Sequence, residues 1–158
     1  MSDISKSLNR NVVRKTLDRV KSVSEIGARI EAFSEQFLSL PYKQNLLIGA
    51  VDEREEFTAS FDGFDCVTYV ETVLSLARAT TFDEFIGNLR QIRYANGIVD
   101  WKTRNHYMTT WIRNNERAGI LRNRTHGSRV IERSRCLRAL EGLPERTVRV
   151  RSIPKREF

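Results

Sequence analysis

The sequence is poor in cysteine and proline, and it contains no long apolar run. Its two cysteines, Cys66 and Cys136, are too few for the disulfide framework of a small secreted domain, and their separation does not fit a metal-binding motif. No stretch approaches the roughly 20 apolar residues that a membrane-spanning helix requires. The first residues, MSDISKSLNRNVVRK, lack the apolar segment of a secretory signal, so the sequence as written predicts a cytoplasmic protein. With 40% hydrophobic and 30% charged residues, the 158-residue chain has the composition of a single globular domain.

Positive charge is concentrated toward the C-terminal end. Residues 101–158 hold 15 of the 27 Lys and Arg residues but only 5 of the 20 Asp and Glu residues. Such a segment can bind an anionic partner, although a basic run more often forms a solvated face. No aromatic residue lies between Trp111 and Phe158, so the stacking platform of a single-strand-binding protein is missing. The sequence therefore argues against nucleic acid as the partner, although an arginine-rich module that binds nucleic acid through residues 122–156 is kept as an alternative.

Apolar spacing predicts two helices in the first forty residues. Residues at spacings of three and four form two stripes, Leu8, Val12, Val13, Leu17 and Val20, and then Ile26, Ile30, Phe33, Phe37 and Leu40. Ser22 with Glu25 fits a capping box that would begin the second helix, and Pro41 would end it. Residues 41–65 then have the composition of a long loop.

The remaining elements are shorter. A helix is expected to begin at Asp65 or Cys66, and its apolar face is expected to consist of Val67, Val70, Leu74 and Ala77. Thr81 with Glu84 predicts the start of another helix, with Phe85, Ile86, Leu89 and Ile92 on its buried side. Asn96–Gly97 predicts a turn, with a β-hairpin as one candidate. Residues 109–119 predict a short helix or an extended loop, and RTVRVRSI at residues 146–153 alternates as a strand does.

Cys66 stands where the third predicted helix begins. The first turn of a helix exposes unpaired N–H groups and the positive end of the helix dipole, and both stabilise a thiolate. A cysteine in this position can therefore serve as a nucleophile at neutral pH. Free cysteines are also among the most frequently buried residues, so the position alone leaves a structural role open.

The segments around Cys66 carry a resemblance to a known family. Asp65–Cys66, Tyr69–Val70–Glu71, Arg93–Tyr94, Asn96–Gly97 and Arg104–Asn105–His106–Tyr107 occur together in this order. This combination resembles the N-acetylmuramoyl-L-alanine amidase-like proteins, long filed as a domain of unknown function, in the papain-like superfamily of NlpC-type cell-wall hydrolases. The resemblance runs from about Leu40 to the end of the chain. The superfamily's Pro-Tyr and Asp-Cys pairs correspond to Pro41–Tyr42 and Asp65–Cys66, whereas Val67–Thr68 replace a frequent Ser-Gly.

The resemblance implies an α+β fold with a papain-like core, in which a helical N-terminal half packs on a small antiparallel sheet. Residues 1–158 would form one domain, with a helical part at 1–40 and a partial amidase core at 41–158. Cys66 would attack an amide carbonyl of a peptidoglycan peptide and form a thioester. Tyr42, Asp65, Tyr69 and Arg104 would contact the substrate. The resemblance implies no cofactor and no metal ion, and it implies the cell envelope as the place of action.

A cysteine hydrolase also needs a histidine that accepts and returns a proton. Only His106 and His126 are present. Related proteins look longer and carry the base on a later strand, in a motif that would follow Phe158, so we expect this chain to lack that region and its sheet to be incomplete, with an exposed edge. His106 is then the candidate base if the chain acts alone, because His126 lies in an arginine-rich linker. A non-catalytic remnant that only binds is the alternative.

Overall fold

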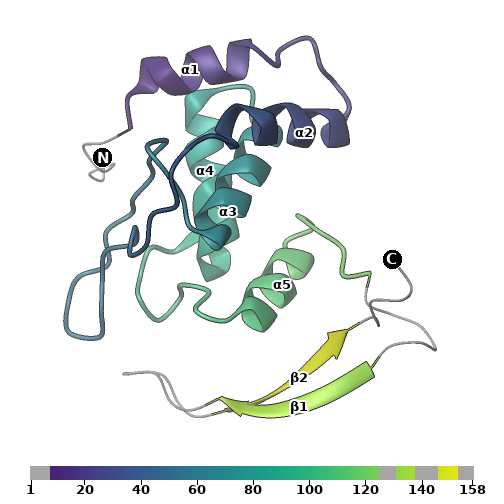
Figure 1. Ribbon diagram of the computed structural model, residues 1–158. Helices are drawn as coiled ribbons and strands as arrows, with labels where there is room; N and C mark the ends of the chain where they lie inside the picture. The colour runs from purple at the N-terminus through teal and green to yellow at the C-terminus, as the bar shows by residue number, and fades with distance from the viewer. Residues whose placement is uncertain (1–7, 125–130, 138–145, 153–158) are drawn as a thin grey trace. The chain divides into compact units, whose positions relative to one another are not determined.

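The computed structural model describes residues 8–124, 131–137 and 146–152 in two compact units, Met1–Arg104 and Asn105–Phe158. The first unit contains four helices and one 3₁₀ turn, namely α1 (Arg10–Asp18), α2 (Ile26–Phe37), α3 (Cys66–Ala77), α4 (Phe82–Arg93) and η1 (Ala95–Gly97) (Figure 1). The second unit contains α5 (Met108–Arg117), β1 (Ile131–Leu137) and β2 (Arg146–Ser152). The described residues are thus mainly helical, with one antiparallel pair of strands. No helix among them is long and apolar enough to cross a membrane.

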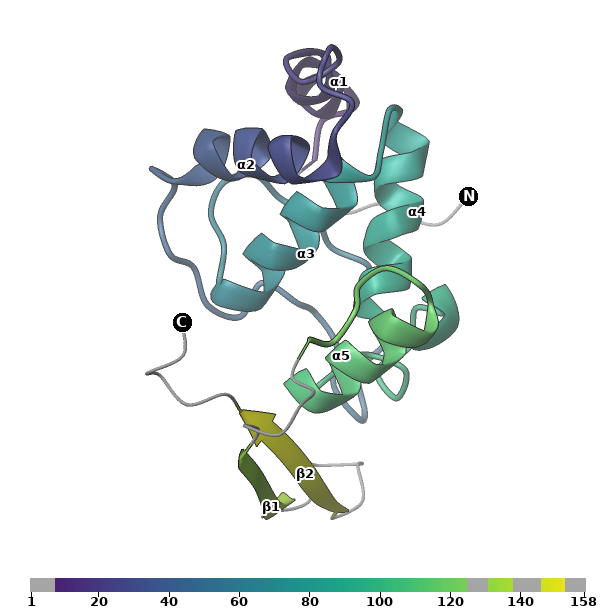
Figure 2. The ribbon, with the colours of Figure 1, turned by 90° about the vertical axis from the view of Figure 1, so that its right-hand side faces the viewer.

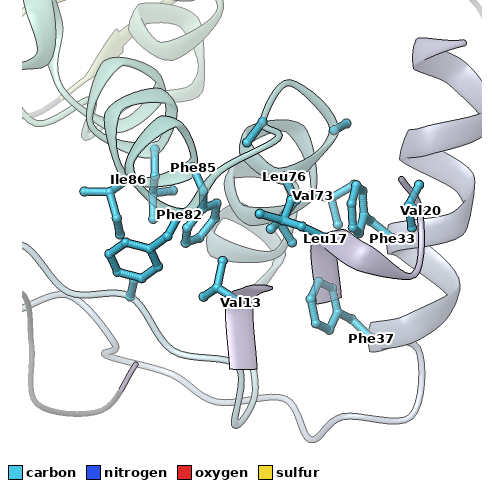
Figure 3. Close-up of a cluster of buried hydrophobic side chains, with 14 of the residues drawn as sticks. Val13, Leu17, Val20, Phe33, Phe37, Val73, Leu76, Phe82, Phe85 and Ile86 are labelled. Atoms are coloured by element: carbon cyan, nitrogen blue, oxygen red, sulfur yellow. The ribbon is translucent and has the colours of Figure 1, made fainter. Parts of the chain in front are cut away.

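Helices α1 to α4 enclose one apolar core. Helix α3 contacts both α2 and α4, and α1 contacts α4, as the two views show (Figures 1 and 2). The core side chains of the four helices include Val13, Leu17, Phe33, Leu76 and Phe85, each with at most 5% of its surface exposed (Figure 3). The ring of Phe37 in α2 also contacts the rings of Phe61 and Phe64, with centroids 5.1 and 5.2 Å away. These ring contacts hold the loop that precedes α3 against the helical core.

A single buried arginine joins three segments of this unit. The guanidinium of Arg29 in α2 donates hydrogen bonds to five main-chain carbonyls, those of Val20, Val23, Leu76, Ala77 and Ala79, at 2.6–3.4 Å. Two of these carbonyls belong to the connection between α1 and α2, and the other three belong to the end of α3 and the turn after it. Because the last carbonyls of a helix have no partner within the helix, Arg29 satisfies groups that would otherwise be buried without one.

The predicted helix starts are partly correct. Thr81 caps α4 in a reciprocal capping box with Glu84, as its sequence predicts, and α3 begins at Cys66 behind the cap of Asp65. The capping box proposed for Ser22 is wrong. Glu25 itself caps α2, because its backbone is extended and its carboxylate accepts a 2.6 Å hydrogen bond from the amide of Ala28. Two members of the predicted apolar stripes, Val12 and Ile26, are 46% and 48% exposed.

The face predicted to be buried on α3 is wrong except at Ala77, which is 3% exposed. Val70 is 42% exposed and Leu74 is only partly buried. The buried residues of the helix are Thr68, Glu71, Thr72, Val73, Ser75, Leu76 and Ala77. The acidic residue Glu71 belongs to the buried face, because its carboxylate packs against the guanidinium of Arg93 in α4. The buried face is therefore rotated about the helix axis relative to the apolar pattern.

The turn at Asn96–Gly97 exists, but it does not belong to a hairpin. Asn96 and Gly97 have φ values of +57° and +69° within η1, and a single bridge between Tyr94 and Arg104 closes the segment. The strand predicted near residues 146–153 is confirmed as β2. It pairs antiparallel with β1, which was not predicted, in a register that runs from Ile131 opposite Ser152 to Leu137 opposite Arg146. Of the two alternatives for residues 109–119, a short helix or an extended loop, the structure has the helix, which is α5.

Candidate functional site

The Pro41–Tyr42 and Asp65–Cys66 pairs lie side by side in the first unit. Tyr42 forms a parallel bridge with Phe64, in which the amide of Lys43 donates to the Phe64 carbonyl at 2.9 Å and the amide of Phe64 donates to the Pro41 carbonyl at 3.2 Å. Gly63 makes this approach possible. Its φ is +148°, and a Cβ atom there would lie 2.5 Å from the Pro41 carbonyl oxygen. The bridge thus brings Tyr42 to the segment that leads into Cys66.

Asp65 fixes the first turn of α3. Its Oδ1 accepts hydrogen bonds from the amides of Val67 and Thr68 at 2.9 and 2.8 Å, and its own amide donates to Thr68 Oγ1 at 3.0 Å. Cys66 is the first helical residue, and it is exposed. The predicted placement of the thiol at a helix N-terminus is therefore confirmed, while its role as a nucleophile stays a prediction.

Tyr69 and Arg104, which are also predicted to contact the substrate, form hydrogen bonds that join parts of the first unit. The hydroxyl of Tyr69 donates to the carbonyl of Ser34 at 3.1 Å, which links α3 to α2. Arg104 forms a 3.1 Å ion pair with Glu55 and donates to the Gly49 carbonyl at 3.3 Å. A contact of Tyr69 or Arg104 with substrate stays a prediction.

Glu55 is a buried residue that sequence reasoning missed. Its side chain is 2% exposed, and its Oε1 accepts a 2.7 Å hydrogen bond from the hydroxyl of Tyr94. Burial of Tyr94 raises the pKa of its phenol above the ordinary value, and the hydrogen bond and negative charge of Glu55 add to this effect. Glu55 lies in an acidic run, DEREE at residues 52–56, so nothing in the sequence distinguishes it from its solvated neighbours.

A second buried ion pair joins Glu71 and Arg93. The Nε of Arg93 lies 2.8 Å from Glu71 Oε2, and the two side chains are 3% and 2% exposed. Nη1 of Arg93 also donates to the carbonyl of Thr58 at 2.6 Å. Both residues occur in the motifs that carry the family resemblance, so a signal for their importance was present, although no function had been assigned to them.

A cavity of about 300 Å³ lies beside the first two turns of α3. Its walls come from loop residues 45–48 and 58–60, from Phe64, and from Thr68, Thr72 and Arg93. Cys66 does not line it, but Phe64 and Thr68 flank Cys66 two residues away on either side. Among the residues that the structure describes, no three His, Cys, Asp or Glu side chains gather as a metal site would require.

The candidate base His106 belongs to the second unit, two residues before the start of α5. Its side chain is partly exposed. The side-chain amide of Asn114 donates a 2.7 Å hydrogen bond to Oδ1 of Asn105. This bond holds the residue that precedes His106. An approach of the His106 ring to Cys66 stays a prediction, and His126 lies outside the described residues.

Comparison with solved structures gives two informative neighbours. A protein from Legionella pneumophila str. Philadelphia 1 superposes with a TM-score of 0.74 at 23% identity, over 92% of this chain and 62% of that one, a likeness that concerns the fold alone. An N-acetylmuramoyl-L-alanine amidase from Bacteroides uniformis superposes with a TM-score of 0.64 at 28% identity, over 72% of this chain and 49% of that one. The chain therefore spans between half and two thirds of the length of these proteins. No curated protein matches it. The model of the N-acetylmuramoyl-L-alanine amidase-like family matches residues 32–156, and the chain therefore belongs to that family.

Proposed function

We propose that the chain is a cysteine hydrolase that cleaves amide bonds in peptidoglycan peptides, with Cys66 as the nucleophile. The observation that carries the proposal is the position of Cys66, exposed at the first residue of α3, behind a cap that fixes the first helical turn. Family membership supports the amide as the bond that is cleaved. In this proposal α3 is the central helix of a papain-like core, of which the described residues form a part.

The chemistry proceeds in two steps. The thiolate of Cys66 attacks the carbonyl carbon of the amide, the C–N bond breaks, and the amine leaves with a proton supplied by the general acid. Water then attacks the resulting thioester and gives a proton to the group that protonated the amine, which releases the carboxylic acid and regenerates the thiolate and the general acid. The positive end of the α3 dipole favours negative charge on the sulfur and on the oxyanion that forms next to it. The amides of Val67 and Thr68 are already engaged by Asp65 in the helix cap.

Three other residues have proposed parts in this reaction. Tyr42 is 66% exposed and is joined by the bridge to the segment before Cys66, so its phenol is available to orient substrate. Asp65 is committed to the helix cap, and it acts by fixing the backbone of Cys66 rather than by transferring a proton. His106 is the proposed proton acceptor, because the only other imidazole, that of His126, lies in the arginine-rich linker.

The test is release of a new amine from a soluble muramoyl peptide, followed by mass spectrometry. We expect the wild-type chain to release the amine, Cys66→Ala to abolish release, and the matched control Cys136→Ala to retain it. Mass spectrometry of the protein in the presence of substrate should also detect an acylated Cys66. Unchanged release by Cys66→Ala would refute the proposed nucleophile. Binding of the muramoyl peptide without release by the wild-type chain would instead support the non-catalytic alternative.

A further inference from the structure

One buried side chain contacts the chain on both sides of Cys66. Arg93, the last residue of α4, donates from Nε to Oε2 of Glu71 at 2.8 Å and from Nη1 to the carbonyl oxygen of Thr58 at 2.6 Å. Its guanidinium carbon also lies 5.6 Å from the centre of the Phe57 ring. Glu71 follows Cys66 in α3, and Thr58 precedes it in the loop. A single guanidinium therefore joins α3 to the loop that leads into it.

The segment between these two contacts is itself held in place. The ring of Phe64 packs against the ring of Phe37 in α2, with centroids 5.2 Å apart. Asp65 then caps the first turn of α3 in a reciprocal capping box. Closely packed segments transmit a displacement instead of absorbing it. A shift at either contact of Arg93 would therefore reach Cys66.

Stability alone does not account for an ion pair at this place. The side chains of Arg93 and Glu71 are 3% and 2% exposed, and such a pair is often no more stabilising than apolar residues of similar volume, because both charges lose their water. The core of the same unit is otherwise filled by apolar side chains such as Leu76 and Phe85, which are fully buried. What the guanidinium adds is direction, since its planar fork of N–H groups holds two acceptors in a fixed geometry.

We infer that Arg93 is a positioning residue for the Cys66 thiol. Its bond to Glu71 fixes the rotation of α3 about its axis, and its bond to Thr58 fixes the loop that enters the helix. Together the two bonds set the direction in which the first helical residue presents its sulfur. This role rests on the proposed function only in that Cys66 is the nucleophile, and its effect on the thiol can be measured without hydrolysis of a substrate.

The test is the rate at which iodoacetamide alkylates Cys66 at pH 7 in the full-length Arg93→Lys chain, measured by mass spectrometry with Cys136 as the internal reference. Lysine keeps a positive charge beside Glu71, but it has no planar fork and cannot hold Glu71 and Thr58 in the same geometry. Cys66 is already exposed, so a looser fold cannot speed its reaction by uncovering it. Alkylation of Cys66 should slow roughly 2- to 5-fold, the effect of losing one interaction with a helix end, while the rate at Cys136 stays the same.

Two further variants separate positioning from stability. Leu76→Ala is the matched control, because it removes a fully buried side chain of α3 and lowers stability without removing either hydrogen bond of Arg93; it should leave the alkylation rate unchanged. The double variant Glu71→Leu/Arg93→Met should be more stable than Arg93→Met, yet its Cys66 should stay slow, because methionine cannot donate to the carbonyl of Thr58. Unchanged alkylation in Arg93→Lys, an equal slowing in Leu76→Ala, or wild-type alkylation in the double variant would overturn the inference.

Kinetics on the soluble muramoyl peptide distinguish this role from the proposed function. If the thiol slows in Arg93→Lys as expected but the wild-type chain hydrolyses no substrate, the positioning role stands and the proposed function fails. If the wild-type chain hydrolyses the substrate, Arg93→Lys should have a lower kcat. A wild-type kcat in that variant would leave the proposed function standing and overturn the positioning role.

Discussion

Replacing Arg93 with methionine should destabilise the first unit more than any exposed substitution can. Methionine fills much of the same volume, so the main loss is electrostatic. Glu71 would remain in the interior, where its side chain is 2% exposed, without the guanidinium that lies 2.8 Å away. The carbonyl of Thr58 would also lose its 2.6 Å hydrogen bond. Removing one partner of a buried ion pair costs about 3–5 kcal/mol, which is a large part of the roughly 5–15 kcal/mol that stabilises a typical domain.

The assay is urea unfolding monitored by far-ultraviolet circular dichroism. Arg10→Met provides the matched control, because Arg10 forms a 3.0 Å pair with Asp83 in which the side chains are 61% and 78% exposed. The control should cost about 1 kcal/mol or less. The double variant Glu71→Leu/Arg93→Met removes both charges of this pair and leaves neither partner unpaired, so it should be more stable than the sum of the two single changes predicts. If Arg93→Met costs no more than Arg10→Met, the reasoning from burial is wrong.

Three further predictions address reactivity, packing and pH. Iodoacetamide should alkylate Cys66 faster than Cys136 at pH 7, because only Cys66 lies at a helix N-terminus. Mass spectrometry of partly labelled protein measures the two rates, and equal rates would show that the thiol of Cys66 is not activated. Leu76→Ala should cost about 2–5 kcal/mol in the same unfolding assay, while Val70→Ala should cost far less, since Leu76 is fully buried and Val70 is 42% exposed. The raised pKa of Tyr94 contributes stability that is complete below about pH 10 and is lost as the pH rises toward the higher folded value. Above pH 10, the free energy of unfolding of Tyr94→Phe should therefore depend less on pH than that of the wild-type chain. Identical curves for the two proteins would contradict a raised pKa of Tyr94.

Local signals in the sequence were sufficient to locate the starts of α3 and α4. The start of α4 depends on Thr81 and Glu84, which are three residues apart and bond to each other's backbone. The start of α3 depends on Asp65, which bonds to the next two amides after Cys66. The residues of a helix cap all lie within one turn of the chain, so a short sequence pattern is enough to identify the cap.

Features that depend on distant residues were not predictable in this way. The buried face of α3 includes Glu71, whose partner Arg93 is 22 residues away, and a charged side chain normally indicates a solvated face. Glu55 is buried for a similar reason, since Tyr94 and Arg104 reach it from 39 and 49 residues away. Strand β1 carries charged and polar residues in the run IERSRCL, and only its pairing with β2 identifies it as a strand.

A change at Gly63 would alter the geometry of the candidate site without removing any side chain of the helical core. The helical core depends on side chains of α1 to α4, whereas the approach of Tyr42 to the Cys66 segment depends on the absence of a side chain at position 63. A methyl group there would meet the main-chain oxygen of Pro41, which cannot turn aside as a flexible side chain can, so the two segments would have to move apart. During evolution, replacement of Gly63 alone can therefore disrupt the site while the helices remain folded. Relatives that carry a larger residue at this position would be expected to keep the helical core and to hold the Pro41–Tyr42 segment in a different place.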